Sequence, residues 1–242
     1  MTHNFDKDYW EEHWEQVGHS TAAAGEAGAA NPHLIREVAA LAPGTALDAG
    51  CGTGAEAIWL AGHGWQVTAA DISATVLARA AALADRASVT DAVTWVEADL
   101  TAWEPGGQFD LVVTNYAHPA IPQLAFYDRI ARWVAPGGTL LIVGHLQHGA
   151  GPAHGHEDGH APGDQHQHQH QHQHGEHSQQ HASTPDVGDE PPAEATVTLA
   201  DITGRLDPQV WRIHTAEEQS RERPGGQGLP LHDVIVRASR LR

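Results

Sequence analysis

The sequence predicts an α/β protein with a Rossmann-like, mostly parallel sheet. Two observations support this fold class. A short apolar run that begins at residue 46 leads into a glycine-rich turn at 48–54. This turn is followed directly by a helical pattern over 55–61. Short β-type runs then alternate with amphipathic helical patterns up to residue 147. Such alternation is typical of parallel strands joined by helices that cover the sheet.

The segment 1–30 is expected to hold one helix and a flexible link. Trp10, Trp14 and Val17 recur at helical spacing, which predicts an amphipathic helix. Its apolar face suits packing on the domain and a lid over a binding site equally well. The core, 31–147, should begin with a second helix at Asn31-Pro32, because asparagine caps helices well and proline suits the first helical position.

The glycine turn at 48–54 is predicted to bind a nucleoside-type ligand. Glycines allow positive φ and a close approach of backbone to ligand, and a helix that begins near Gly54 offers free N–H groups. The spacing departs from G-x-G-x-x-G, and the Asp48 carboxylate would repel a pyrophosphate. S-adenosylmethionine therefore fits the turn better than NAD. Cys51 is better explained as a small residue at the ligand than as a nucleophile, because no basic residue adjoins it.

Acidic residues follow the next two predicted strands. The strand 65–71 ends on Asp71, which is 23 positions after Asp48 (71 − 48). This is close to the interval of about 20 residues at which a second-strand carboxylate meets ribose hydroxyls. Asp71 would also suit the N-terminus of the next helix, 73–85. The strand 93–96 is followed by Asp99, which an ordinary capped turn would equally explain.

Three polar residues follow the fourth and fifth predicted strands, 109–114 and 139–144. A predicted helix over 122–134 and a Pro-Gly-Gly turn at 135–138 lie between these two strands. The carboxyl ends of parallel strands share one edge of a sheet, where reacting groups are expected. The candidate catalytic residues are therefore Asn115, His118 and His145. His118 suits either a general base or the wall of the site.

The segment 148–193 is predicted to be a disordered, histidine-rich insertion, since its Gly, Pro, Gln, Glu and His cannot build a core. Unprotonated imidazoles bind Zn, Ni, Co or Cu. The expected metal ligands are His166, His168, His170, His172 and His174. A solvated tract without a role is the alternative.

The remaining segment, 194–242, is expected to complete the same domain as the core. Apolar residues suit a helix over 197–206, and two strand patterns at 210–215 and 231–237 flank a loop rich in glycine at 223–228. A connection of this kind predicts an antiparallel strand pair.

The sequence resembles the class I S-adenosylmethionine-dependent methyltransferases on the motif at 48–61, on Asp71, on Asp99 and on the Pro-Gly-Gly turn. The motif with Asn31-Pro32 and the opening at 9–12 is similar to small bacterial methyltransferases of the tellurite-resistance and thiopurine type. The resemblance implies a seven-stranded sheet with a C-terminal antiparallel strand. It also implies that adenine lies beside Asp99 and the Ala98 backbone N–H, and that S-adenosylmethionine is bound by Asp48, Gly50, Cys51, Gly52, Gly54, Asp71, Ile72, Ala98, Asp99 and Asn115.

Composition narrows the possible functions. The chain has 13 lysines and arginines against 31 acidic residues, a formal net charge of −18, which argues against a nucleic-acid partner. No apolar run approaches the roughly 20 residues of a membrane span, and the first residues lack a signal-peptide pattern. We therefore expect a cytoplasmic methyltransferase whose acceptor is a small molecule, such as a thiol, a selenium or tellurium species or a small metabolite. The alternative is a metal-buffering or metal-sensing protein on a methyltransferase scaffold, and the oligomeric state is left open.

Overall fold

The computed structural model describes residues 5–20, 28–146, 197–221 and 231–242. The strands are β1 (Thr45–Ala49), β2 (Gln66–Asp71), β3 (Val93–Glu97), β4 (Phe109–Asn115), β5 (Val134–His145), β6 (Trp211–Arg221) and β7 (Leu231–Arg240). The helices are α1 (Lys7–Ser20), α2 (Pro32–Val38), α3 (Ala55–Gly62), α4 (Ala74–Arg86), α5 (Gln123–Ala131) and α6 (Leu199–Gly204), with a short 3-10 helix at Thr90–Ala92.

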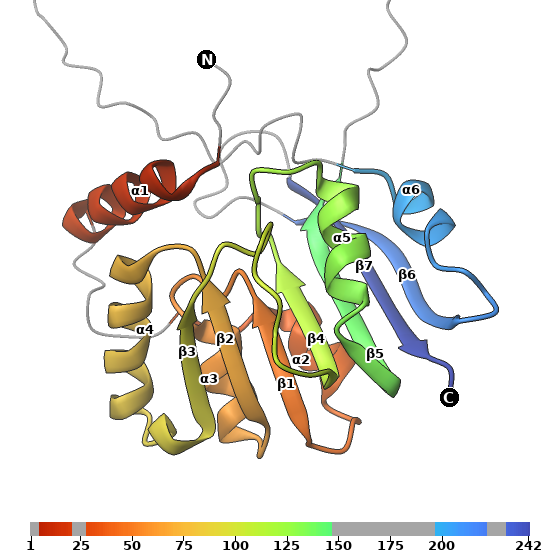
Figure 1. The fold of residues 1–242 in the computed structure, drawn as a ribbon, viewed down its shortest axis with the longest axis horizontal. Helices are drawn as coiled ribbons and strands as arrows, with labels where there is room; N and C mark the ends of the chain where they lie inside the picture. Colours follow the sequence, from red (N-terminus) through yellow and green to blue (C-terminus); the bar gives the residue numbers. More distant parts are fainter. Residues whose placement is uncertain (1–4, 21–27, 147–196, 222–230) are drawn as a thin grey trace, which may run out of the picture. The chain divides into compact units, whose positions relative to one another are not determined.

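All seven strands form one sheet in the order β3-β2-β1-β4-β5-β7-β6 (Figure 1). The pairs β1–β2, β2–β3, β1–β4 and β4–β5 are parallel, whereas β7 is antiparallel to both β5 and β6. The predicted fold class is confirmed. Neighbouring β1 residues pack on opposite faces: Ala46 with α2 and α3, and Leu47 with α5 and α6.

The expected helix starts are present where capping residues predicted them. The Asn31 side chain accepts from the His33 backbone N–H at 2.9 Å, and Pro32 begins α2. Ser73 caps α4 by accepting from the Val76 N–H at 3.2 Å. Local side-chain chemistry therefore places the helices that flank β1 and β2.

Some boundaries differ from the sequence-based expectation. The Pro-Gly-Gly segment lies inside β5 and is not a turn before it, because the β4–β5 register shifts between Phe109 and Leu111 and absorbs the extra residues. A β-bulge of this kind needs Gly137, whose φ is +86°. The helix α5 ends at Ala131, earlier than predicted, and β6 runs on to Arg221. The predicted hairpin loop at 223–228 lies outside the described residues.

In the described part of the chain, every helix is too short or too polar to cross a membrane.

A buried carboxylate ties α2 to the C-terminal strands. Glu37 is 6% exposed. It accepts hydrogen bonds from Thr215 Oγ1 and Arg36 Nε, both at 2.7 Å, and pairs with Arg237 Nε at 3.0 Å. Burial alone would raise the pKa of Glu37, but the bonds from Thr215 and Arg36 and the two cations outweigh it and lower that pKa.

We expect Glu37→Gln to lower the free energy of unfolding by about 2 kcal/mol at neutral pH, because it removes the carboxylate charge that pairs with Arg36 and with the partly buried Arg237. The folded-state pKa lies below the unfolded value, so this stabilisation is present above the unfolded pKa of about 4.3 and is lost as the pH falls through the folded pKa. Urea unfolding at several pH values measures it. Glu217→Gln is the control: its side chain is 45% exposed, and the loss should stay below about 1 kcal/mol. Equal losses would contradict the assignment.

Candidate active site

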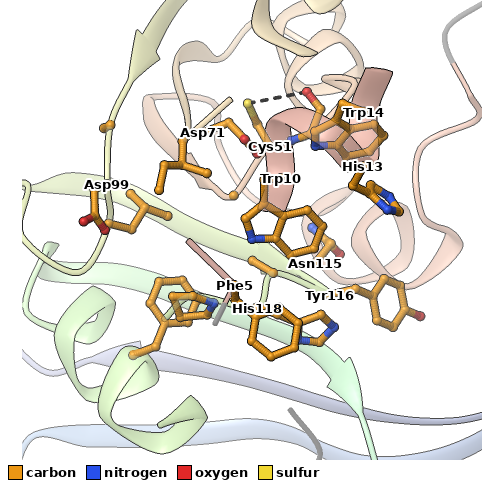
Figure 2. Close-up of a pocket in the computed structure, with 18 of the residues that line it drawn as sticks. Phe5, Trp10, His13, Trp14, Cys51, Asp71, Asp99, Asn115, Tyr116 and His118 are labelled. Carbon is orange, nitrogen blue, oxygen red and sulfur yellow. Dashed lines mark hydrogen bonds between the residues drawn. The ribbon is translucent and has the colours of Figure 1, made fainter. Parts of the chain in front are cut away.

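A cavity of about 310 Å³ opens at the edge of the sheet where β1, β2, β3 and β4 end. Its floor comes from the glycine turn and from the strand ends, and one wall comes from Phe5 and from α1 (Figure 2). Eight of the ten residues expected to bind the cofactor line it: Gly50, Cys51, Gly52, Asp71, Ile72, Ala98, Asp99 and Asn115. The strand-edge argument therefore located the cavity correctly.

Asp48 and Gly54 do not line the cavity. Asp48 is 1% exposed beneath the turn, where the nearby Ala57 N–H acts to lower its pKa against the larger effect of burial. Gly54 has a φ of +78°, and a Cβ there would lie 2.5 Å from a ring carbon of Trp95. Packing against β3, and not a ligand, requires glycine at position 54. The expectation of direct contact with the cofactor is therefore wrong for both Asp48 and Gly54.

Three carboxyl groups gather at the turn. Glu56, in the first turn of α3, lines the cavity and accepts from the Asn31 N–H at 3.0 Å. Burial, and then the nearby charges of Glu56 and Asp71, raise the pKa of Asp48 well above its usual range. Burial also raises the pKa values of Glu56 and Asp71. The raised pKa values mean that the charged forms of these three groups are disfavoured in the ligand-free site, where no lysine or arginine pairs with them among the described residues.

Asp71 joins the turn to the next helix. Its Oδ2 accepts from the Gly52 N–H at 2.9 Å, and its Oδ1 accepts from the Ser73 N–H at 3.0 Å. Asp71 can both hold the start of α4 and contact a ligand, because each carboxylate oxygen has a second lone pair that can face the cavity. Cys51 is buried beside it, and burial with the charges of Asp48 and Asp71 raises the pKa of the thiol. The thiol therefore stays protonated, which disfavours a nucleophile.

The expected adenine contacts are only partly available. Asp99 Oδ1 accepts from the backbone N–H and the hydroxyl of Thr101, at 2.8 and 2.7 Å. These bonds form the ordinary capped turn that was the alternative explanation of Asp99 in the sequence. The Ala98 N–H donates to the Asp71 carbonyl at 2.8 Å. This amide is already used, so the role given to the Ala98 N–H is wrong in this structure, although the residue lines the cavity.

The exit of β4 presents buried polar atoms to the cavity. Asn115 Oδ1 and Nδ2 and His118 Nδ1 are buried without hydrogen-bond partners among the described residues. Between them Tyr116 adopts a φ of +55°. Non-glycine residues rarely adopt this conformation, and it is typical of functional sites. A bound ligand would satisfy the polar atoms that the protein leaves unpaired.

His118 is held by Gln123, which sequence reasoning missed. Burial lowers the pKa of His118, against a smaller opposite effect of a hydrogen bond with Gln123. Gln123 is itself fixed by donating from Nε2 to the Ala117 carbonyl at 2.9 Å. His118 Nδ1 is buried without a partner among the described residues. We expect the neutral imidazole to carry its proton on Nε2, because a buried N–H without an acceptor is rarer than a buried lone pair without a donor.

His145 lies behind this layer. Its ring stacks on Tyr116, with centroids 4.6 Å apart, and on His118, with centroids 5.4 Å apart. It is not among the residues that line the cavity. Its predicted catalytic contact is therefore wrong, because the β4 exit loop covers the end of β5.

The helix α1 covers the glycine turn. The Glu11 carboxylate accepts from Ser73 Oγ and the Ala74 N–H, both at 2.8 Å, and so caps the start of α4. Arg79 Nη1 donates to the Trp14 carbonyl at 2.6 Å. The Trp14 ring lies 3.4 Å from where a Gly52 Cβ would be. The two roles proposed for the amphipathic face are thus combined, since α1 packs on α4 while Trp10, His13 and Trp14 line the cavity.

The chain was compared with known proteins. Residues 46–138 match a family described as a methyltransferase domain. This segment is a methyltransferase domain. An uncharacterized methyltransferase of Mycobacterium tuberculosis is 40% identical over 119 residues, which are 47% of this chain and 58% of that protein. The chain thus matches less than two thirds of this relative's length.

Solved structures support the fold over most of the chain. A protein studied for the conversion of a disulfide bond into a thioacetal group during echinomycin biosynthesis has a TM-score of 0.58 and 24% identity, covering 96% of this chain and 91% of that one. TehB from Haemophilus influenzae has a TM-score of 0.57 and 15% identity, covering 96% and 67%. At these identities the likeness concerns the methyltransferase fold.

The predicted metal ligands at 166–174 lie outside the described residues. Within the ranges that are described, no three His, Cys, Asp or Glu side chains are grouped to hold a metal ion.

We expect Asp48→Asn to raise the free energy of unfolding of the ligand-free domain by about 1 kcal/mol at neutral pH, because it replaces a carboxyl whose ionised form is disfavoured by burial with a neutral amide of similar size. The folded-state pKa of Asp48 lies above the unfolded value, so its favourable contribution is present below the unfolded pKa and is lost as the pH rises through the folded pKa. The advantage of the variant should shrink on acidification. Urea unfolding without cofactor tests this, and a less stable variant at neutral pH would refute it.

The His118 tautomer is directly measurable. Long-range nitrogen–proton NMR spectra should show the proton of the neutral ring on Nε2. Gln123→Leu should lower the pKa of His118, because it removes the side chain that favours the charged form of the ring. Gln108→Leu, which loses only an exposed bond to the Arg132 carbonyl, is the control. A proton on Nδ1 in the unmodified protein would contradict the assignment.

Proposed function

We propose that the chain is an S-adenosylmethionine-dependent methyltransferase acting on a small molecule. The observation that carries the proposal is the cavity at the glycine turn, where Glu56 and Asp71 lie against a backbone that glycines leave open. The methyl donor has a positively charged sulfur and an ammonium group, and a site that gathers carboxylates favours such charges. The methyltransferase domain at 46–138 supports the same reading.

The residues present fit this group. Asp71 would bind the ribose hydroxyls, Ile72 would face the adenine, and the backbone of Gly50 and Gly52 would leave room for the chain of the donor. Asn115 keeps a donor and an acceptor unpaired at the same edge. Two charge-assisted bonds from one carboxylate to a diol are a strong and specific contact.

When bound, S-adenosylmethionine supplies a methyl group that is activated for displacement by the positive sulfur. The work left to the chain is to align the acceptor, exclude water and take up a proton. The helix α1 and Phe5 cover the cavity, and His118, which lines it, would receive the proton. A base whose pKa is lowered stays unprotonated and ready at neutral pH.

Several predictions from the sequence are retained here as proposals. The acidic chain argues for a small acceptor and not a nucleic acid. A cytoplasmic location stays a proposal. Binding of Zn, Ni, Co or Cu by the histidines at 166–174, and with it a metal-buffering or metal-sensing role, rests on the sequence alone.

Calorimetric titration with S-adenosylmethionine should show binding at one site, and Asp71→Asn should weaken it at least about tenfold, the effect of roughly 1.4 kcal/mol. The variant loses charge toward the ribose but keeps an acceptor. Affinity should rise from acid to neutral pH, because the raised pKa values of Glu56 and Asp71 require those groups to release protons when a cation binds. Asp85→Asn, on the exposed side of α4, is the control. Unchanged affinity in Asp71→Asn would refute the cofactor assignment.

A further inference from the structure

We propose that the methyl acceptor is an uncharged, flat molecule that presents a hydroxyl or a ring N–H to His118. The proposal rests on the proposed function and specifies the acceptor side of the same cavity. It departs from the acceptors suggested by resemblance, which included thiols and oxyanions of tellurium or selenium.

The charges of the cavity exclude an anion. Three acidic residues line it, Glu56, Asp71 and Asp99, and none of them forms an ion pair with a lysine or arginine among the described residues. Neither lysine nor arginine occurs among the described lining residues. Lys7 lines a neighbouring cavity, but its ammonium is paired with Glu97. A second negative charge placed beside these groups would be repelled, and in a partly dry cavity this repulsion amounts to several kcal/mol.

The two histidines of the lining do not supply the missing positive charge. Burial lowers the pKa values of His13 and His118, so both rings are neutral at physiological pH. A carboxylate, phosphate or oxyanion acceptor would therefore find no counter-charge on the described lining residues of the protein. An uncharged acceptor avoids the penalty.

The walls fit a flat ring. Phe5 and Trp10 lie nearly parallel, with an interplanar angle of 27° and centroids 6.1 Å apart. The Phe5 ring is 6.0 Å from that of His118. Figure 2 shows Trp10, Asn115, Tyr116 and His118 around the same part of the cavity. Aromatic rings contribute contact area and stacking geometry to a planar partner, so this part of the site favours a ring over a chain.

The unpaired polar atoms indicate what the ring carries. His118 Nδ1 lacks a donor, and Asn115 lacks both a donor and an acceptor. A thiol ionises readily and needs no base, whereas a hydroxyl or a ring N–H must lose its proton during the reaction. The acceptor oxygen or nitrogen forms a bond to the methyl carbon as the carbon–sulfur bond breaks. The electron pair of that bond stays on the sulfur, and the proton passes to His118 Nδ1.

Matched pairs of compounds test the charge rule. We would measure binding to the protein saturated with S-adenosylhomocysteine, and methylation with S-adenosylmethionine, for para-hydroxybenzamide against para-hydroxybenzoate. Benzimidazole carboxamide against benzimidazole carboxylate is the second pair. Each pair has nearly the same shape and differs by one negative charge. The uncharged member should bind at least about tenfold more tightly and be methylated on the oxygen or ring nitrogen.

A variant separates charge from shape. Ala120 lines the cavity and is exposed, so Ala120→Lys places a cation at its edge without filling the interior. The preference for the uncharged member should fall by about tenfold in Ala120→Lys. It should remain in Ala120→Gln, which adds similar bulk without charge.

Three results would overturn the proposal: equal or tighter binding of the carboxylates, the same preference in Ala120→Lys as in Ala120→Gln, or neither binding nor methylation of any of the four compounds. If S-adenosylmethionine still binds in such a case, the acceptor proposal alone fails. If it does not bind, the proposed function itself fails.

Discussion

The site depends on carboxylates that are buried beside a backbone turn and are not neutralised by cations. Asp71 holds the turn through Gly52 and the start of α4 through Ser73. Asp48 lies beneath them with Oδ2 unpartnered among the described residues. Burying charge without a partner is unfavourable, and the raised pKa values express that cost. A cationic ligand relieves this cost, so burial that disfavours the ligand-free site favours binding of a cation at this edge of the sheet.

Under the proposed function, the same carboxylates restrict the charge of the methyl acceptors that the cavity can bind. A cavity that favours a cation repels an anion, and only a neutral acceptor escapes this repulsion. The helix α1 strengthens the effect because it covers the turn and lowers the access of water. Glu11, which caps α4 next to Ser73, links this cover to the segment that also holds Asp71. The helix that covers the cavity is thus tied, through Ser73 and Ala74, to the segment that holds Asp71.

Much of the fold was predictable because its signals are local. Caps at Asn31 and Ser73, the glycine turn and the alternating strands and helices each depend on neighbouring residues. The errors have a different origin. Asp48 and Gly54 belong to the motif, but Asp48 is buried beneath the turn and Gly54 packs against Trp95. His145 is the last residue of β5, where it stacks on His118 of the β4 exit loop. Gln123 carries no sequence signal for its bond to His118.

The sequence by itself determined the order of the elements, the edge at which the site lies and the acids that follow β2 and β3. These follow from hydrophobic periodicity and from the common direction of parallel strands. Only the tertiary structure decided which of those side chains reach the cavity, which amide is already used, and which nitrogen of His118 is left free. Such properties depend on contacts between segments far apart in the chain, and no local pattern encodes them.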